Sequence, residues 1–152
     1  MAVRDLARFP LHLGLGATAI AQPEFTGMAW YGDYMTRHAV DGAEGRLVAI
    51  HHFTDNWQAW EMHPLGEEVV VCIAGELTLI QQNTGGIQQS AGGIQQNAGG
   101  IQEDVAGDEL RITLKVGEYA INPRGVWHTA DIAGAASVLF ITAGAGTEHR
   151  ER

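Results

Sequence analysis

The sequence predicts an all-β protein, either a sandwich or a barrel. Short segments rich in β-branched and aromatic residues recur along the chain, separated by Gly, Pro, Asn or Asp at spacings of about 8 to 12 residues. Helical periodicity is scarce, and 20 glycines suit a fold with many turns. Because 152 residues are enough for one domain with a sizeable core, we expect residues 1–152 to form a single domain.

The β-rich segments can be assigned individually. One short helix is expected at about 30–37. The expected strands are 11–20, 46–53, 59–63, 68–74, 76–81, 110–115, 119–121, 126–130 and 137–143.

Composition limits the partners and the compartment. The net charge of −9 argues against nucleic acid or an anionic membrane surface as a partner, since both attract basic proteins. No apolar run reaches the length of a membrane span. The single cysteine, Cys72, excludes an internal disulfide and fits a reducing cytoplasm. The N-terminal stretch resembles a secretory leader only weakly, because Asp5, Pro10 and His12 interrupt it. We therefore expect a cytoplasmic location.

Residues 80–103 contain a tandem repeat: IQQNTGG, IQQSAGG, IQQNAGG and IQE. Two adjacent glycines in each unit oppose a helix, and a seven-residue period would put successive isoleucines on opposite faces of a strand. Two interpretations remain. The repeat is a tolerated insertion in a connecting loop, or it is an arm that pairs with a neighbouring chain. Neither interpretation gives it catalytic chemistry.

The segment 68–74 is apolar on both faces of the strand it predicts. Glu68, Val70, Cys72 and Ala74 share one face, and the residues between them share the other. Both faces should therefore be covered, one of them by an N-terminal segment or by a second subunit. A homodimer is the expected oligomer.

Polar residues interrupt the β-rich pattern just before that strand. Glu61 and His63 lie on the same face by strand alternation, and Glu68 follows at the start of the apolar run. Carboxylates and imidazoles in a buried setting are costly unless something pairs with them. Their spacing is regular: four residues separate His63 from Glu68, and six separate Glu68 from Gly75.

A second polar stretch follows the repeat, at 117–132. Five residues separate Gly117 from Pro123, and two separate Gly125 from His128. Together the two stretches resemble the cupin family, whose motifs have the forms G-x5-H-x-H-x3or4-E-x6-G and G-x5-P-x-G-x2-H-x3-N. The first motif lies at about 55–75, the second at 117–132, and the resemblance extends over about 46–143. It implies a double-stranded β-helix, a barrel of jelly-roll type, with the repeat inserted between the motifs.

The sequence departs from the family pattern at three positions. Glu61 stands where the first motif has its first histidine, Asp55 where that motif begins with glycine, and Ile132 where the second motif has asparagine. The resemblance implies a metal held by three histidines and a glutamate inside the barrel. In this chain the corresponding ligands are His63, Glu68, His128 and Glu61.

Such a donor set suits a divalent transition metal such as Fe, Mn, Ni, Cu or Zn. Glu61 is either the fourth ligand or a catalytic general base. The alternative is a metal-free pocket in which Glu61 pairs with His128, or Glu68 with His63.

Two functions follow from these alternatives. One is a metal-dependent oxygenase, isomerase or lyase that acts on a small sugar-like or acidic molecule. The other is a non-catalytic, metal-free domain that binds or senses a small molecule. An assembly protein that uses the repeat arm ranks third.

Other candidates are weaker. His51 and His52 are adjacent, so at most one faces the barrel interior. Trp57, Trp60 and Trp127 either stack on a ligand or belong to the core.

Overall fold

The computed structural model describes residues 2–82, 103–106 and 108–152. Most of the repeat at 80–103 lies outside the described residues, so both interpretations of it stay predictions. Within the described part, residues 80–82 end one strand and Glu103 begins another. The assignment of the whole chain to a single domain also stays a prediction.

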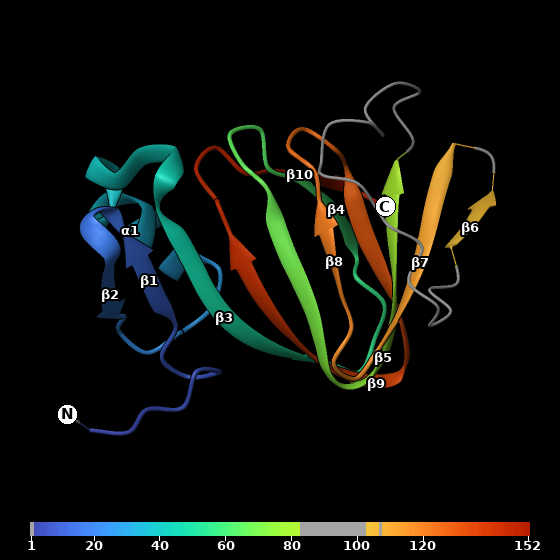
Figure 1. Cartoon of the computed structure of the whole chain (residues 1–152), viewed down its shortest axis with the longest axis horizontal. Helices are drawn as coiled ribbons and strands as arrows, with labels where there is room; N and C mark the ends of the chain where they lie inside the picture. Colours follow the sequence, from blue (N-terminus) through green and yellow to red (C-terminus); the bar gives the residue numbers. More distant parts are fainter. Residues whose placement is uncertain (1, 83–102, 107) are drawn as a thin grey trace.

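The all-β prediction is confirmed. About 52% of residues lie in strands and 14% in helices, and the strands form a curled antiparallel sheet of jelly-roll type (Figure 1). The helical segments are η1 (Leu15–Ala17), α1 (Ala29–Arg37) and η2 (Ala39–Glu44). The strands are β1 (Leu11–Gly14), β2 (Thr18–Ala21), β3 (Arg46–Phe53), β4 (Ala59–Met62), β5 (Glu68–Gln82), β6 (Glu103–Ala106), β7 (Glu109–Lys115), β8 (Tyr119–Asn122), β9 (His128–Thr142) and β10 (Glu148–Glu151).

Strand β9 joins the parts of the fold that matter for the candidate site. The main path of the sheet is β2-β1-β3-β9-β5-β7-β6, so β9 lies between β3 and β5. Its first residue pairs with β4, which in turn pairs with β10. Strand β8 pairs with the first half of β5. Segments from both motifs and from the C-terminal strand therefore meet around the start of β9.

Two pairs of predicted strands are single long strands. β5 runs through 68–82 without a break, and β9 runs through 128–142. Their pairing shifts register around Gly75, which has φ +73°. A Cβ at Gly75 would lie 1.9 Å from the carbonyl oxygen of Ala135. Gly75, which separates two predicted strands in the sequence, therefore lies at a β-bulge that bends the sheet.

The prediction for 11–20 was wrong in its topology. This segment is not one strand but the hairpin β1–β2, with η1 between the strands. Strand β10 was not predicted. Its sequence, EHRE, is exposed and has no apolar alternation, so its strand conformation comes from pairing with β4.

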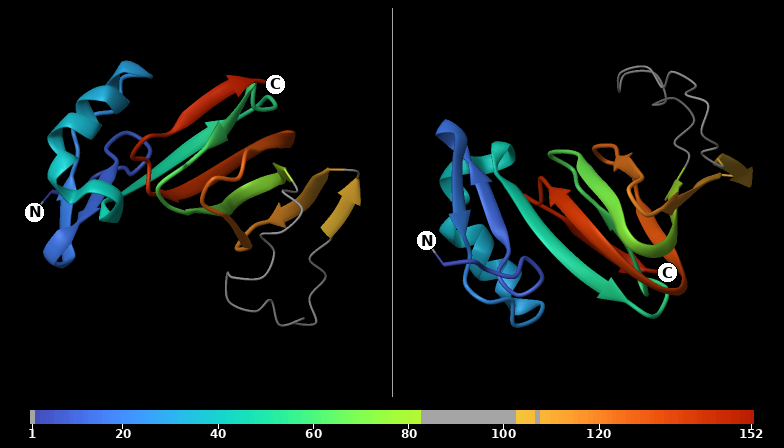
Figure 2. Two further views of the ribbon diagram at one scale, coloured as in Figure 1. Left: turned by 90° about the horizontal axis from the view of Figure 1, so that it is seen from above. Right: turned by 60° about the horizontal axis from the view of Figure 1, so that its bottom comes forward.

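The core fills the inner face of the sheet. Val70, Cys72, Leu77, Leu79 and Val138 are fully buried there and pack with neighbouring aliphatic side chains. At the other end of the molecule, α1 lies beside the hairpin β1–β2 (Figure 2). Trp30 and Tyr34 of this helix pack against Leu47 of β3. The described residues contain no helix long and apolar enough to cross a membrane.

The outer face of β5 remains partly exposed. The hairpin β1–β2 extends the sheet beside β3, and Ile73 on β5 is exposed. Of the two coverings expected from the sequence, an N-terminal segment or a second subunit, the N-terminal hairpin leaves this face partly exposed.

Candidate metal centre

The structure brings the four predicted site residues together. Glu61 lies on β4, His63 directly follows that strand, Glu68 begins β5 and His128 begins β9. Glu61 and His128 are paired in the register of β4 and β9. The amide N–H of Gly125, in the turn of the second motif, donates a hydrogen bond to the carbonyl oxygen of His63 at 2.9 Å. The two motifs are thus joined directly at the site.

The donor atoms of these residues converge. Nε2 of His63 lies 3.2 Å from Oε1 of Glu61 and 3.5 Å from Oε1 of Glu68. Nε2 of His128 lies 3.4 Å from Oε2 of Glu68. One donor atom each from Glu61, His63 and His128 lie within 4.8 Å of one another. Two side-chain ion pairs were expected for a metal-free pocket. The Glu68–His63 ion pair forms, whereas the carboxylate of Glu61 forms an ion pair with His63 instead of His128.

Hydrogen bonds on the far sides of both rings determine their tautomers. Nδ1 of His128 lies 3.1 Å from the carbonyl oxygen of Val126, which can only accept. Nδ1 of His63 lies 2.8 Å from Oγ1 of Thr147, whose hydroxyl hydrogen is donated to the carbonyl of Gly144. Both Nδ1 atoms must therefore carry hydrogen, and in the neutral rings both Nε2 atoms present a lone pair to the site.

Those two Nε2 atoms are buried without a hydrogen-bond partner among the described residues. The nearby carboxylate oxygens lie within ion-pair distance but accept no hydrogen bond from them. When both rings are neutral, lone pairs and carboxylate oxygens therefore face one another with no hydrogen between them. Such a cluster of acceptors is stabilised by a positive charge placed at its centre.

Glu68 is held as an anion. It is buried, and its carboxylate accepts hydrogen bonds from the Thr142 hydroxyl at 2.6 Å and the Asn122 amide at 2.9 Å. Burial alone would raise the pKa of the Glu68 carboxyl, but His128 and His63 outweigh it and hold this pKa below its usual range. The pKa of His63 is raised, because Glu68 and Glu61 outweigh the opposing effect of burial. The cluster therefore attracts positive charge.

The separations fit a first-row metal ion. Ligand atoms about 2.1 Å from a metal lie roughly 3.0 to 3.4 Å from one another in octahedral or tetrahedral geometry. The contacts at 3.2, 3.4 and 3.5 Å fall in or next to this range, with Glu68 approaching His63 through Oε1 and His128 through Oε2. The group whose donor atoms all lie within 4.8 Å of one another consists of Glu61, His63 and His128, so Glu68 is the ligand that must shift most to join them. Two imidazole nitrogens and carboxylate oxygens are donors that suit Fe, Mn, Ni, Cu or Zn. These residues could hold a divalent ion.

Two side-chain amides form a chain of hydrogen bonds that ends on the Glu68 carboxylate. The Gln81 amide donates to Oδ1 of Asn122 at 2.8 Å, and Asn122 in turn donates to Glu68. Sequence reasoning missed both residues and Thr142. The available signal was weak, since Asn122 is a polar residue that ends an apolar strand. The motif position expected to hold asparagine, Ile132, lies outside the cluster, and its neighbour Asp131 pairs with Arg111 and Arg152.

Sequence reasoning also missed His149. It lies on β10 opposite Glu61 in the strand register, and its Nε2 is 3.2 Å from Oε2 of Glu61. Glu61 therefore bridges His63 and His149 with its two oxygens. No sequence signal was available, because β10 itself carries no strand pattern.

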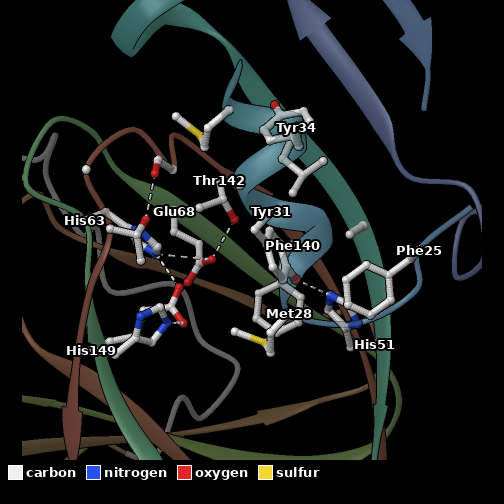
Figure 3. A pocket seen from close by; sticks show the side chains of 18 of the residues that line it. Phe25, Met28, Tyr31, Tyr34, His51, His63, Glu68, Phe140, Thr142 and His149 are labelled. Carbon is white, nitrogen blue, oxygen red and sulfur yellow. Dashed lines mark hydrogen bonds and ion pairs between the residues drawn. The ribbon is translucent and has the colours of Figure 1, made fainter. Parts of the chain in front are cut away.

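A cavity of about 530 Å³ opens beside the cluster (Figure 3). His51 lines it, whereas His52 is exposed and contacts Ser137, so one of the two adjacent histidines faces inward as expected. Trp57 also lines the cavity. Trp60 and Trp127 do not line it, and both rings lie against the Arg150 guanidinium.

A second group of possible ligands lies near α1. The donor atoms of His12, His38 and Asp41 lie within 4.8 Å of one another. Both nitrogens of His12 already have partners, however, in the Tyr34 hydroxyl and the Asp41 carboxylate. The rings of His12 and His38 are stacked 3.6 Å apart, so their in-plane lone pairs do not converge. This group is a hydrogen-bonded packing cluster that links β1, α1 and η2.

Comparison with known proteins gives structural similarity only. No family model and no curated protein matches the chain. Hydroquinone 1,2-dioxygenase from Sphingomonas sp. TTNP3, solved with 4-hydroxybenzoate bound, is similar over 66% of this chain and 61% of its own, with 17% identity and a TM-score of 0.44. Oxalate decarboxylase from Bacillus subtilis, solved as a single-residue variant, is similar over 77% of this chain and 26% of its own, with 13% identity and a TM-score of 0.48.

The chain thus spans less than two thirds of either solved protein. The two similarities add nothing to the resemblance to the cupin family that the motifs predict. That resemblance rests on the two motifs and on the jelly-roll sheet in which they meet.

Proposed function

We propose that this protein holds one divalent transition-metal ion through His63, His128, Glu68 and Glu61, and uses it to transform a small organic molecule. The observation that supports the proposal is the pair of buried imidazole nitrogens, Nε2 of His63 and of His128, which have no hydrogen-bond partner among the described residues and lie 3.2 to 3.5 Å from carboxylate oxygens. A bound ion would satisfy all these atoms at once.

The side chains of the four residues differ in how firmly the surrounding protein holds them. Glu68 is buried and fixed by two hydrogen bonds, and both histidine rings are oriented through Nδ1. Glu61 is the exception, because its side chain is 30% exposed and its second oxygen contacts His149 at the cavity. Glu61 is therefore the group that can leave the cluster and accept a proton from a bound molecule.

A bound metal of this class supplies Lewis acidity or redox chemistry at the cavity wall. Two histidines with carboxylates approach the donor set of non-haem iron sites, which supports an oxygenase. Isomerase and lyase chemistry need the same parts: a polarised oxygen and a nearby base. The reaction class is thus oxygenase, isomerase or lyase.

A metal-free binding or sensor domain is the second candidate. The ion pairs that His63 makes with Glu61 and Glu68 favour it, since a protonated His63 would supply the missing positive charge. The two candidates differ in whether metal occupies the cluster.

Metal analysis separates them. We would purify the chain without added metal, measure its metal content, and titrate chelator-treated protein with Mn²⁺ and Zn²⁺. The proposal expects one ion per chain in the wild type and in His52→Ala, whose ring is exposed outside the cavity, but not in a His63→Ala/His128→Ala double variant. Absence of stoichiometric metal, with no change in stability on chelation, would support the metal-free domain.

The oligomer proposed from the sequence is a homodimer, and the outer face of the sheet supports it. Antiparallel register aligns aliphatic side chains and one tyrosine in two rows across β3, β9, β5 and β8. The rows are Val48, Ile141, Val69 and Ile121, and Ile50, Leu139, Val71 and Tyr119. Tyr119 is 63% exposed and Ile121 39%. A second copy on this face would cover both. A cytoplasmic location stays an expectation from composition.

A further inference from the structure

The walls of the cavity differ sharply from one end to the other. Away from the metal-binding cluster, its lining includes Phe25, Met28, Phe53 and Phe140, and Trp57 continues this wall to the cluster, where its ring centroid lies 6.5 Å from that of His128. These come from the segment before α1, from β3, from the β3–β4 connection and from β9, and Figure 3 shows Met28, Phe140 and Phe25 gathered on the side away from His63. Aromatic and thioether side chains of this kind pack against flat apolar surfaces.

The size of the cavity admits ligands larger than a single ring. A cavity of roughly 150 Å³ lined by apolar side chains already accommodates benzene. At about 530 Å³, this cavity has room for a substituted ring or a two-ring molecule.

The charge of the cavity disfavours anions. Its lining includes the carboxylates of Glu61 and Glu68, and the described residues that line it include no lysine or arginine. If both carboxylates bind a divalent ion, their charges cancel that of the ion, so the metal end is then close to neutral. A ligand carboxylate would in either case lose its hydration without meeting an unpaired cation.

Several polar side chains line the cavity, but the hydroxyls of Tyr34, Thr142 and Thr147 already have partners within the protein. Glu61 and His149 lie at the end near the cluster, and both can accept a hydrogen bond. The Tyr31 hydroxyl lies 3.2 Å from Nε2 of His51 on the other side, as Figure 3 shows. Burial, together with the charges of Glu61 and Glu68, raises the pKa of Tyr31 to about 12, so this phenol stays a neutral donor or acceptor. A sugar would leave most of its hydroxyls facing aromatic rings.

We propose that the pocket selects a neutral molecule with a flat, aromatic body and a hydroxyl group directed at the Glu61 end, in preference to a sugar or a carboxylic acid. The inference rests on the proposed function only in that both use this pocket. It names the substrate class that the sequence left as sugar-like or acidic.

Calorimetry with three probes tests the proposal on the whole chain. The probes are 2-naphthol, its anionic counterpart 2-naphthoate, and glucose, each titrated into chelator-treated protein and into protein loaded with Mn²⁺. We expect 2-naphthol to bind at least about tenfold more tightly than either other probe in both forms, because only it buries a ring without burying a charge. Equal or tighter binding of 2-naphthoate or glucose in either form would overturn the proposal.

A variant at the cavity entrance makes the charge argument specific. Met28 lines the cavity and is 70% exposed, so a charged side chain there leaves the core intact. Met28→Lys should raise the affinity for 2-naphthoate about tenfold, whereas the matched control Met28→Leu should not change it. An unchanged affinity in Met28→Lys would contradict the claim that charge excludes anions.

The outcomes also distinguish this inference from the proposed function. A preference for 2-naphthol in a protein that binds no metal would support the inference while refuting the metal proposal. Stoichiometric metal with a preference for glucose or 2-naphthoate would do the reverse.

Discussion

Oγ1 of Thr147 lies 2.8 Å from Nδ1 of His63 and donates its own hydrogen to the carbonyl oxygen of Gly144. The threonine can therefore only accept from the ring, and this leaves the lone pair of the neutral ring on Nε2, inside the cluster. Thr147 comes from the connection between β9 and β10, outside both motifs and 84 positions from His63 in sequence. A residue outside the motifs thus orients one of their histidines.

Replacing Thr147 with valine tests this relationship. Valine keeps the shape of the side chain but removes the acceptor, so the ring loses the contact that orients Nε2. We expect the affinity for Mn²⁺ or Zn²⁺ to fall about 10- to 100-fold, as is typical when a partner of a metal-binding histidine is lost. Calorimetric titration measures it. Thr54→Val, at an exposed threonine, is the control and should bind like the wild type. Equal affinities in both variants would refute an orienting role.

Asn122 should stabilise the fold through the charge on Glu68. Asn122→Ala removes one of two hydrogen bonds to a buried carboxylate, which should lower the free energy of unfolding by about 1 to 3 kcal/mol in urea denaturation without metal. In a Glu68→Gln background the same substitution should cost less, because no buried charge is left under-solvated. Equal costs in the two backgrounds would mean that Asn122 acts through packing alone.

Asp131 gives a pH-dependent contribution to stability. Partial burial raises the pKa of its carboxyl, but hydrogen bonds from Arg152 and Arg111 outweigh burial and leave this pKa below the usual value. A depressed folded-state pKa stabilises the protein above the unfolded-state pKa of about 3.9, and the contribution disappears as pH falls through the folded-state value. The carboxylate is 29% exposed, so solvent screening keeps this contribution small.

Asp131→Asn should therefore lower the free energy of unfolding by roughly 1 kcal/mol at neutral pH. The difference from wild type should shrink on acidification below about pH 4. Thermal denaturation of both proteins across this range measures it. A difference that is independent of pH would assign the effect to something other than the ionised carboxylate.

The proposed dimer predicts a response to charge on the outer sheet face. Tyr119→Lys/Ile121→Lys should convert a dimer to a monomer in sedimentation experiments, because lysines cannot be buried opposite their own copies without a large cost. Val40→Lys is the control: it adds a charge at a residue of η2 that is 89% exposed and belongs to neither row. A monomeric wild type would refute the dimer.

Much of the fold could be read from the sequence because the inner strands carry their own pattern. β3 was predicted with the bounds it has, and α1 differs by one residue at its start. The failures occurred where conformation depends on distant pairing. β10 is a strand because β4 lies beside it, and β5 continues through Gly75 because a bulge absorbs the glycine.

The candidate site likewise contains residues that a local pattern predicts and residues that depend on distant contacts. Glu61, His63, Glu68 and His128 could be found because motif spacing marks them, and strand alternation puts Glu61 and His63 on one face. Their supports could not be found, since Thr147, Asn122 and His149 act through contacts across 41 to 88 positions of sequence. The composition of the cavity wall was likewise hidden, because it is assembled from segments that lie far apart along the chain.

The central claim is that one ion sits among His63, His128, Glu68 and Glu61. Anomalous diffraction from crystals grown with Mn²⁺ or Zn²⁺, with data collected at the absorption edge of the metal, tests it most directly. We expect one strong peak per chain, about 2.1 Å from Nε2 of both histidines and from a carboxylate oxygen of Glu68. Crystals with no peak in this cluster, or with the ion bound at His12 and Asp41 instead, would contradict it.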